Sequence, residues 1–392
     1  MSKVYLSHHN IVSALGFTAE EVIRNIKNEV SGVSLIDNPA YFNTPFYGSV
    51  IPQEDLETNF KPLETTTKYT KLEKMMLLSL HQTLKASNVV LNKKVGLIIS
   101  STKGNIDVLS NPSFPENRAY LSTLGSIIKE YFGFKNEAIV LSNACVSGLL
   151  ATAIAKRYIK EGVYDHVFIV SGDTVNPFVL SGFNSFQAMS TAACKPYDKD
   201  RTGVNLGEAA ASVLVTLQYD SLSTEAVEII GDGSRNDANH ISGPSRTGEG
   251  LFRSINAAIT EANIAIQDID FISAHGTATL FNDEMEAIAF NRLGLSKTPI
   301  HSLKGYFGHT LGASGLIETL VGMHSLHQNT LFKSLGYQTL GVSKPINIIE
   351  KTKPNSNTTF LKTASGFGGS NTAVLFKKVQ SKKDQKDVKK NY

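Results

Sequence analysis

One pattern occurs twice in this chain and limits its fold more than any other feature. It consists of an apolar run, a turn of small residues and a helix that opens with Gly and Ala. The two copies are "AIVLSNACVSGLLATAIAKRYI" (residues 138–159) and "PIHSLKGYFGHTLGASGLIETLVGMHSL" (residues 299–326). Around each copy, further apolar runs alternate with stretches of helical periodicity, which places helices on both faces of a mostly parallel sheet. The sequence therefore predicts an α/β fold with a duplicated unit and a site at the carboxyl ends of the strands.

The repeat also predicts the domain organisation. The first unit should span residues 1–222 and the second residues 223–378, and because no low-complexity linker separates them they should pack as one body. The charged residues 379–392 are predicted to form a disordered tail. Near the N-terminus, "TAEEVIRNIKN" (residues 18–28) is typical of a helix, with Thr18 as N-cap and Glu21 completing a capping box.

Composition and charge exclude several classes of protein. Hydrophobic residues make up 41% and charged residues 19% of the 392, as in a compact globule. A net charge of +3, with no basic run interleaved with aromatic residues, argues against a nucleic-acid partner. No run reaches the roughly 20 apolar residues of a membrane span, and the opening residues do not resemble a signal peptide. Since two cysteines make no disulfide framework, we expect a cytoplasmic protein.

The candidate reactive residues lie where strands end. Cys145 follows an apolar run and precedes a helix, whose N-terminal amides should lower the pKa of the thiol. His275, in "SAHGTAT", and His309, in "GYFGHTLGASG", occupy the same place after other strands. Cys194 lacks this setting and is predicted to be structural. No usual metal-ligand spacing occurs, so we expect no metal site.

Four ordered motifs resemble those of a known family. "NACVSG", "AHGTAT", "KGYFGH" and "GFGGSN" are similar to the signatures of β-ketoacyl-acyl carrier protein synthases of the Cys-His-His type, and the resemblance runs from residue 4 to 376. It implies the thiolase-like duplicated α/β fold, with layered helices, mixed sheets and an internal pseudo-two-fold. It also implies decarboxylative condensation of an acyl thioester with malonyl-acyl carrier protein through an acyl-cysteine. No cofactor is expected, because the substrates themselves carry phosphopantetheine.

The resemblance assigns a role to each matching residue. Cys145 becomes the nucleophile, His275 and His309 the catalytic histidines, and Lys304 an orienting lysine. Further assignments are Glu286 as the partner of that lysine, Asp283 and Glu318 as supporting carboxylates, Phe367 as a gate and oxyanion donor, Thr277 and Thr279 as pantetheine contacts, and Lys68, Lys71 and Lys195 as docking sites for an acidic carrier protein.

The chemistry explains why these residue types are needed. A sulfur nucleophile takes the acyl group, and backbone amides hold the oxyanion that forms. Two neutral imidazoles then stabilise the enolate that malonyl decarboxylation produces, so the histidines should serve decarboxylation more than acylation. A homodimer, or a heterodimer with a homologous subunit, is expected through the apolar strand at residues 166–173.

Some alternatives stay open at this stage. The chain between Gly104 and Cys145 is shorter than is usual in the family, which leaves the primer and its chain length undetermined. The pathway could be fatty-acid synthesis or a specialised aryl-polyene or polyketide route. A catalytically inactive chain-length-factor type of subunit is disfavoured because Cys145, His275 and His309 are all present. A thiolase or other Cys-His-Asn enzyme is disfavoured because His309 stands where that class has Asn.

Overall fold

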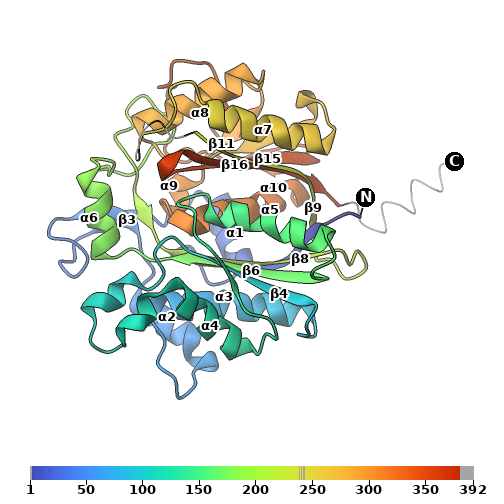
Figure 1. Cartoon of the computed structure of the whole chain (residues 1–392). Coiled ribbons are helices and arrows are strands. Elements are labelled where there is room, and N and C mark those ends of the chain that lie inside the picture. The colour runs from blue at the N-terminus through green and yellow to red at the C-terminus, as the bar shows by residue number, and fades with distance from the viewer. Residues whose placement is uncertain (1, 238, 240, 242, 380–392) are drawn as a thin grey trace.

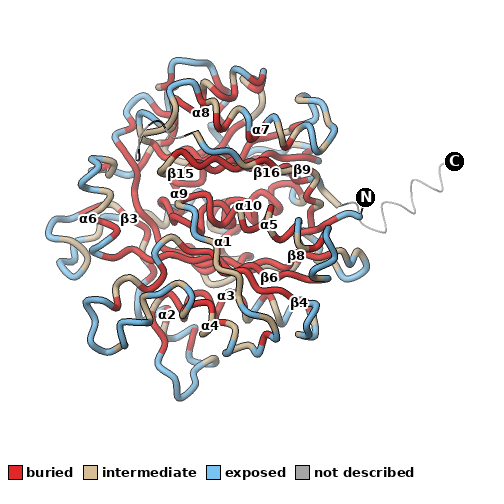
Figure 2. The backbone as a smooth tube through the Cα atoms, in the orientation of Figure 1, coloured by how far each residue is buried: buried red, intermediate tan, exposed pale blue. Residues whose placement is uncertain are grey.

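The computed structural model describes residues 2–237, 239, 241 and 243–379. Apart from Val379, the tail predicted to be disordered lies outside these residues. Two sheet layers enclose a central layer of helices, and further helices cover the outer face of each sheet (Figure 1). The outer helices and loops carry exposed residues, while the sheets and the central helices are buried (Figure 2). The layers therefore follow the order α, β, α, β, α.

The first repeat forms a five-stranded mixed sheet. In spatial order its strands are β1 (Tyr5–Ser13), β8 (Ala209–Thr216), β6 (His166–Asp173), β4 (Val95–Ser100) and β5 (Ile139–Leu141). β8 runs antiparallel to both β1 and β6, whereas β4 runs parallel to both β6 and β5. The expected mostly parallel sheet is thus mixed, because the chain enters and leaves the repeat through antiparallel strands.

The second repeat has the same arrangement. Its strands, in spatial order, are β9 (Val227–Asn236), β16 (Ser370–Lys378), β15 (Thr359–Gly366), β10 (Phe271–Ser273) and β11 (Pro299–His301), and β13 (Asn347–Ile348) adds an edge. Their directions match those of the first repeat, strand for strand. Two residue pairs between β1 and β9 join the sheets into one 11-stranded ladder. The duplicated fold is confirmed, while the boundary at residue 222 stays a prediction.

The helices also repeat. α5 (Ser147–Lys160) follows β5, and α10 (Ser314–His327) follows β11. Both lie in the central layer (Figure 1). α3 (Lys71–Ser87) packs on β1 and β8 as α7 (Glu249–Ala262) packs on β9 and β16. The other helices are α1 (Ala19–Lys27), α2 (Gln53–Phe60), α4 (Leu121–Phe132), α6 (Pro177–Ser185), α8 (Leu280–Arg292) and α9 (Lys304–Phe307).

Shorter elements complete the described chain. One small sheet pairs β2 (Ser34–Ile36), β3 (Phe46–Ser49) and β7 (Leu206–Gly207), and another pairs β12 (Thr330–Leu331) with β14 (Lys353–Pro354). The 3-10 turns are Lys61–Leu63, Ile106–Ser110, Glu116–Ala119, Ile266–Asp268, Leu311–Ala313 and Phe367–Gly369.

Glycines let the two central helices approach each other closely. A Cβ on Gly148 would lie 2.6 Å from the carbonyl oxygen of Gly312, and a Cβ on Gly315 would lie 2.8 Å from the Cβ of Leu149. Since real Cβ atoms do not approach so closely, the helices could not cross here with larger residues. The small residues that open both helices thus bring the two nearby turns together.

Two local predictions have different outcomes. The Thr18 side chain accepts a hydrogen bond from Glu21 N at 3.2 Å, as expected of an N-cap. The Glu21 carboxylate, however, accepts from Phe17 N, so the predicted capping box is incomplete. The strand expected to form a dimer, β6, lies inside the sheet between β8 and β4. That prediction was wrong, because both hydrogen-bonding edges of β6 are already occupied.

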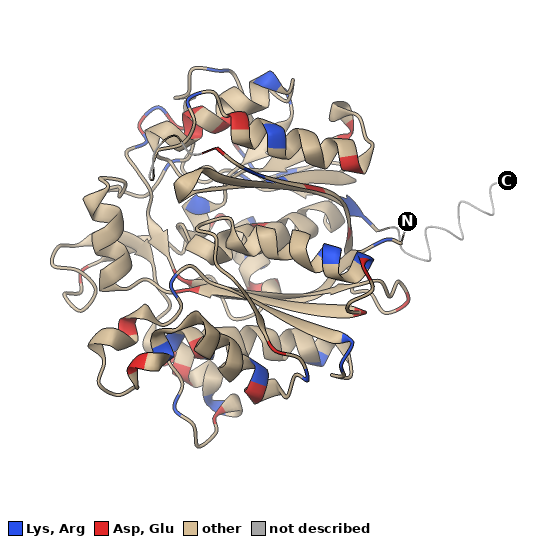
Figure 3. Cartoon of the chain, in the orientation of Figure 1, with Lys and Arg blue, Asp and Glu red and all other residues tan. Residues whose placement is uncertain are grey.

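The surface carries charges of both signs. Basic and acidic residues are scattered along the outer helices and loops (Figure 3). Among the helices of the described residues, none is long and apolar enough to cross a membrane.

Candidate active site

Cys145 lies in a tight turn between β5 and α5. Ala144, just before it, has a φ of 44°, a left-handed conformation that is uncommon for a residue with a side chain. Ser147 fixes the turn, because its Oγ accepts from Asn143 N at 2.8 Å and donates to Ala144 O at 2.6 Å. The turn holds the Cys145 side chain among buried residues.

His309 lies within hydrogen-bonding distance of Cys145. Its Nε2 is 3.0 Å from Cys145 Sγ, and its Nδ1 is 3.0 Å from Ser314 Oγ, at the start of α10. The backbone N–H of His309 donates to Asn205 O at 2.6 Å, which anchors the turn to the other repeat. The imidazole is thus held at both ends, with one nitrogen aimed at the sulfur.

His275 completes the group from the end of β10. Its ring centroid is 5.1 Å from that of His309, and the two planes are nearly perpendicular. Its Nδ1 is buried without a hydrogen-bond partner. Cys145, His275 and His309 each place a potential ligand atom within 4.8 Å of the others, the only such group of three or more His, Cys, Asp or Glu found in the described chain. The structure therefore brings together the three reactive residues singled out in the sequence.

Burial sets the protonation of this group. It lowers the pKa of both histidines well below the usual value, and the nearby Lys304 and Lys362 lower it further. Both imidazoles are therefore neutral at physiological pH. Burial also raises the pKa of the Cys145 thiol to about 11, against smaller opposing effects of Lys304 and the Phe367 N–H. The expected lowering of this pKa is thus not found, and His309 Nε2 is the proton acceptor within reach.

The predicted partner of Lys304 was wrong. Lys304 is fully buried, and its Nζ lies 2.5 Å from Glu318 Oε1 rather than at Glu286. Glu286 accepts hydrogen bonds from His275 N at 2.9 Å and Gly276 N at 2.7 Å. Its carboxylate therefore shapes the turn that carries His275.

Sequence reasoning missed Lys362, a second cation beside Glu318. Its Nζ lies 2.6 Å from Glu318 Oε2, and its side chain is fully buried on β15. The signal was a lysine inside the otherwise uncharged run "TFLKTASGF". A buried lysine needs a carboxylate partner, which that run itself does not offer.

Asp283 and the two threonines form the loop after His275. Asp283 accepts from Thr277 N at 2.9 Å and Tyr197 N at 2.7 Å, and burial raises its pKa to about 7. The hydroxyls of Thr277 and Thr279 are 2.8 Å apart, and Thr279 is the N-cap of α8. The loop therefore presents threonine side chains at the cavity from a fixed backbone.

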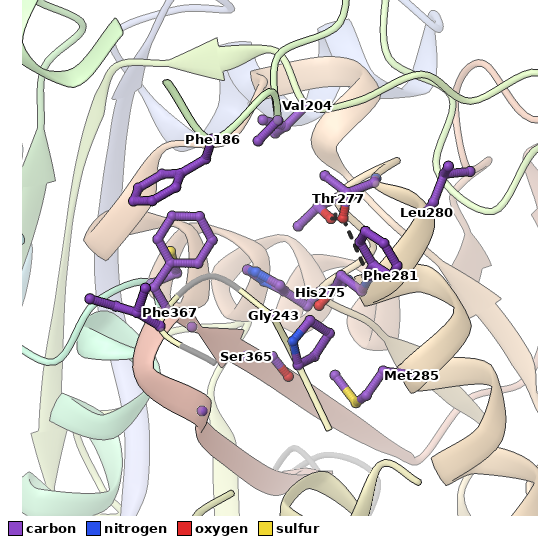
Figure 4. A pocket seen from close by; sticks show the side chains of 18 of the residues that line it. Phe186, Val204, Gly243, His275, Thr277, Leu280, Phe281, Met285, Ser365 and Phe367 are labelled. Carbon is purple, nitrogen blue, oxygen red and sulfur yellow. Dashed lines mark hydrogen bonds between the residues drawn. The ribbon is translucent and has the colours of Figure 1, made fainter. Parts of the chain in front are cut away.

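A cavity of about 450 Å³ opens onto the three reactive residues. Phe186 and Phe367 lie at one side of it, and Thr277, Leu280 and Phe281 at the other, with His275 between them (Figure 4). Large apolar side chains at its mouth are exposed, including Phe281 at 75%. The space suits a long, narrow and partly apolar ligand arm that reaches Cys145.

Phe367 contacts both the nucleophile and an aromatic cluster. Its backbone N–H donates towards Cys145 Sγ, and Gly366 packs so closely that a Cβ there would lie 3.0 Å from Cys145 N. Its ring stacks on Phe183 with centroids 5.4 Å apart and meets the edge of Phe186 at the same distance. Two backbone amides therefore flank the sulfur. Phe183 and Phe186 were missed, although "GFNSF" places two aromatic residues three positions apart, at the end of α6.

The three predicted docking lysines differ in exposure. Lys71 is largely buried and forms an ion pair with the buried Glu208, so it is not available to a partner, and its prediction was wrong. Lys68 is exposed, with its Nζ 5.2 Å from the ring centroid of Phe114, and Lys195 is half-buried. The docking role of these two stays a prediction. Cys194 is buried, and its sulfur donates to Lys304 O at 3.3 Å, in keeping with a structural role.

Family models match both repeats. The β-ketoacyl synthase N-terminal domain matches residues 11–220, and the C-terminal domain matches residues 226–338. The chain belongs to the β-ketoacyl synthase family. Its membership confirms the resemblance found in the four motifs.

Relatives in the family include proteins named as 3-oxoacyl-[acyl-carrier-protein] synthases and as polyketide β-ketoacyl synthases. The chain is 30% identical to the putative mitochondrial 3-oxoacyl-[acyl-carrier-protein] synthase of Schizosaccharomyces pombe, over 64% of each chain. It is 32% identical to 3-oxoacyl-[acyl-carrier-protein] synthase 2 of Rhizobium meliloti, over 62% of this chain and 61% of the relative. It is 31% identical to putative polyketide β-ketoacyl synthase 1 of Streptomyces cyaneus, over 71% of this chain and 70% of the relative. The match thus spans under two thirds of the first two relatives.

Solved ketosynthases share the whole fold. A Xenorhabdus doucetiae ketosynthase in complex with its chain length factor superposes with a TM-score of 0.84 at 22% identity, covering 96% of this chain and 98% of that one. A β-ketoacyl synthase from Burkholderia phymatum STM815 also gives 0.84, at 21% identity and with 97% and 100% covered. The thiolase-like fold of this β-ketoacyl synthase is therefore confirmed.

Proposed function

We propose that this chain is a 3-oxoacyl-[acyl-carrier-protein] synthase that condenses an acyl thioester with malonyl-acyl carrier protein. The observation that carries the proposal is the position of His309 Nε2, 3.0 Å from Cys145 Sγ, with His275 beside it at the base of the cavity. Family membership and relatives named 3-oxoacyl-[acyl-carrier-protein] synthase support it.

In the first half-reaction the acyl group moves to Cys145. The sulfur attacks the thioester carbonyl while His309 Nε2 takes the thiol proton. The oxyanion that forms receives hydrogen bonds from the amides of Cys145 and Phe367, which flank the sulfur. The carbonyl–sulfur bond to pantetheine then breaks, and the departing pantetheine thiolate recovers the proton from His309. The enzyme is left with an acyl-cysteine and a neutral His309.

In the second half-reaction a malonyl thioester binds in the same cavity. Its carboxylate leaves as carbon dioxide, and the electron pair of the broken carbon–carbon bond forms an enolate. His275 and His309, both neutral, donate hydrogen bonds from Nε2 to the enolate oxygen. For His309 this requires that the ring first exchange its Nδ1 hydrogen for one on Nε2 through solvent, after which Nδ1 accepts from the Ser314 hydroxyl. The nucleophilic carbon attacks the acyl-Cys145 carbonyl, the carbon–sulfur bond breaks, and the 3-oxoacyl thioester leaves. The Cys145 thiolate takes the Nε2 proton of His309, whose ring regains a proton at Nδ1 from solvent, so one proton is consumed for each carbon dioxide released.

The substrates suggest the partners. An acyl carrier protein would insert its phosphopantetheine arm beside Thr277 and Thr279, and Lys68 and Lys195 would meet its acidic surface. A second subunit, identical or homologous, would pair along β5, the half-buried apolar edge strand that ends four residues before Cys145. The Xenorhabdus doucetiae ketosynthase was solved with such a partner, its chain length factor. The proposed compartment is the cytoplasm, and the pathway is fatty-acid or specialised polyene or polyketide elongation.

One experiment tests the proposal and identifies the primer. The purified protein is offered a panel of acyl-carrier proteins, and mass spectrometry then records which acyl group is attached to Cys145. We expect one class of acyl group on Cys145 and, after malonyl-carrier protein is added, a product longer by two carbons. The Cys145→Ala variant should carry no acyl group. A Cys145→Ala protein that still condenses would refute the proposal.

A further inference from the structure

Lys362 is buried next to the reactive histidines but has no part in the steps above. It lies on β15, which pairs in parallel with β10, the strand that ends two residues before His275. Its Nζ donates to Ser273 O at 3.1 Å, Ala274 O at 3.3 Å and Thr363 O at 2.6 Å. The ammonium group therefore ties the strand end that carries His275 to the neighbouring strand.

Lys362 also changes the charge balance around Glu318. The two oxygens of this carboxylate are divided between two lysines, Lys304 at Oε1 and Lys362 at Oε2. Two buried cations thus share the Glu318 carboxylate, and Lys362 is also attracted by Glu286. Burying an extra cation is costly, so the arrangement needs a physical explanation.

The other titratable groups around Lys362 lie on neighbouring strands and helices. On β11, His301 is neutral, because burial lowers its pKa to about 4. On α8, Glu286 accepts hydrogen bonds from the backbone of the His275 loop and from Thr363 Oγ1 at 3.3 Å. Its negative charge is thus shared with backbone donors, in addition to its attraction to Lys362.

The remaining neighbours belong to the reactive group and its loops. Asp283 of α8 lies beside Glu286, and the Tyr197 hydroxyl donates to Glu286 at 2.9 Å. Asp173, at the end of β6, accepts from Gly312 N at 2.8 Å and lies near Cys145. Burial raises the pKa of Asp283 to about 7 and also raises the pKa of the Asp173 carboxyl and of the Tyr197 phenol. Besides Glu318, the carboxylate that attracts Lys362 is Glu286.

We propose that Lys362 is a positioning residue for the decarboxylation step. Its ammonium group fixes the end of β10 from which His275 projects. It is also a second buried cation, which disfavours protonation of His275 and His309. This inference rests on the proposed function. It gives this second buried lysine a role in the site.

The physical consequence is a dependence on pH. Lys304 and Lys362 both lower the pKa of His275 and His309. Without Lys362, Lys304 and Glu318 form a balanced pair, so protonating a histidine becomes easier and its pKa rises. Because an imidazolium already holds the proton that would otherwise be withdrawn from Cys145, activity should then fall at a higher pH than in the wild type.

The test compares pH profiles of carbon dioxide release from malonyl-carrier protein during turnover with an acyl-carrier protein, which requires that Cys145 be deprotonated and acylated first. In Lys362→Met and Lys362→Gln, we expect the acid limb to move to higher pH, with an additional loss at pH 6 relative to pH 8 of about three- to tenfold. Lys362→Gln keeps a hydrogen-bond donor, so it separates the charge from the carbonyl contacts. Lys362→Arg retains the cation and should keep the wild-type acid limb.

Lys156 provides a matched control. It is also buried, but it pairs with Asp232 and Glu261 at the far end of α5. Lys156→Met should lower the melting temperature without moving the acid limb. If Lys362→Met does not fold, Lys362→Gln alone decides the result.

Each result has a defined meaning. Superimposable acid limbs in an active wild type and in folded Lys362→Gln overturn the inference while leaving the proposed function intact. A wild type that releases no carbon dioxide from any malonyl thioester overturns the proposed function and the inference with it. A shift in Lys362→Gln and Lys362→Met, but not in Lys362→Arg or Lys156→Met, supports the inference.

Discussion

The buried ion pair of Lys71 and Glu208 gives a quantitative prediction, because a lysine expected to bind a partner instead has a structural role. Glu208 is fully buried and, besides the lysine, accepts from Ile51 N at 2.7 Å and Val175 N at 3.2 Å. Lys71 begins α3, and its Nζ also donates to Ile51 O at 2.9 Å. The pair therefore joins α3 to β8 and to the loop after β3.

The change Lys71→Met leaves the Glu208 carboxylate without its cation. Leaving a buried charge unpaired destabilises a protein by about 3–5 kcal/mol. The Glu208 carboxylate can instead become neutral by binding a proton. For a group with the ordinary pKa of 4.5, this protonation costs about 4 kcal/mol at pH 7.5 and about 1.4 kcal/mol at pH 5.5. The folded variant then binds more protons than the unfolded chain, so its stability falls as the pH rises. We expect a loss of about 3–4 kcal/mol at pH 7.5 and less than half of that at pH 5.5.

Urea unfolding followed by circular dichroism at both pH values measures this difference. Adding Glu208→Gln to Lys71→Met removes the orphaned charge and should recover most of the loss at pH 7.5. Lys68→Met, a change at the neighbouring exposed lysine, should leave stability unchanged. If Lys71→Met unfolds like the wild type while raising KM for a carrier-bound substrate, the lysine faces a partner and this reasoning is refuted.

Three further predictions concern the site and its partners. His275→Ala should still acylate Cys145 at a near wild-type rate but release little carbon dioxide. His309→Ala should slow both steps, because of the two histidines it is the one whose Nε2 lies 3.0 Å from Cys145 Sγ; equal losses in both variants at both steps would contradict this division. Lys68→Glu with Lys195→Glu should raise KM for an acyl-carrier substrate and spare turnover of an acyl-pantetheine mimic, and a parallel loss on both substrates would place the docking site elsewhere. Pairing along β5 predicts a particle of twice the 42.5 kDa chain mass by light scattering, and a stable monomer at micromolar concentration would exclude it.

The fold could be predicted because the sequence repeats its own local pattern. The small residues after each apolar run are required where α5 crosses α10, so they mark the same element in both halves. Cys145, His275 and His309 could be found for the same reason, since each follows a strand and the strand ends converge. The direction of β8 could not be predicted, because antiparallel and parallel buried strands have similar apolar runs.

Pairings between distant residues were beyond the sequence. Glu286 and Glu318 are both acidic residues on helices near Lys304, and only the crossing of α10 over the site decides that Glu318 reaches it. Lys71 resembled a solvated lysine at a helix start, because Glu208, which buries it, lies far along the chain. The pKa of Cys145 was misjudged because the helix N-terminus was considered without the desolvation that burial brings.

The most direct test of the central claim is a single-turnover measurement on preformed acyl-enzyme. Enzyme carrying an acyl group on Cys145 is mixed with malonyl-carrier protein, and carbon dioxide, free Cys145 and the 3-oxoacyl product are measured together. We expect all three to appear in equal amounts in the wild type, and we expect His275→Ala to keep its acyl group on Cys145. Product formed while the acyl group stays on Cys145, or condensation without release of carbon dioxide, would contradict it.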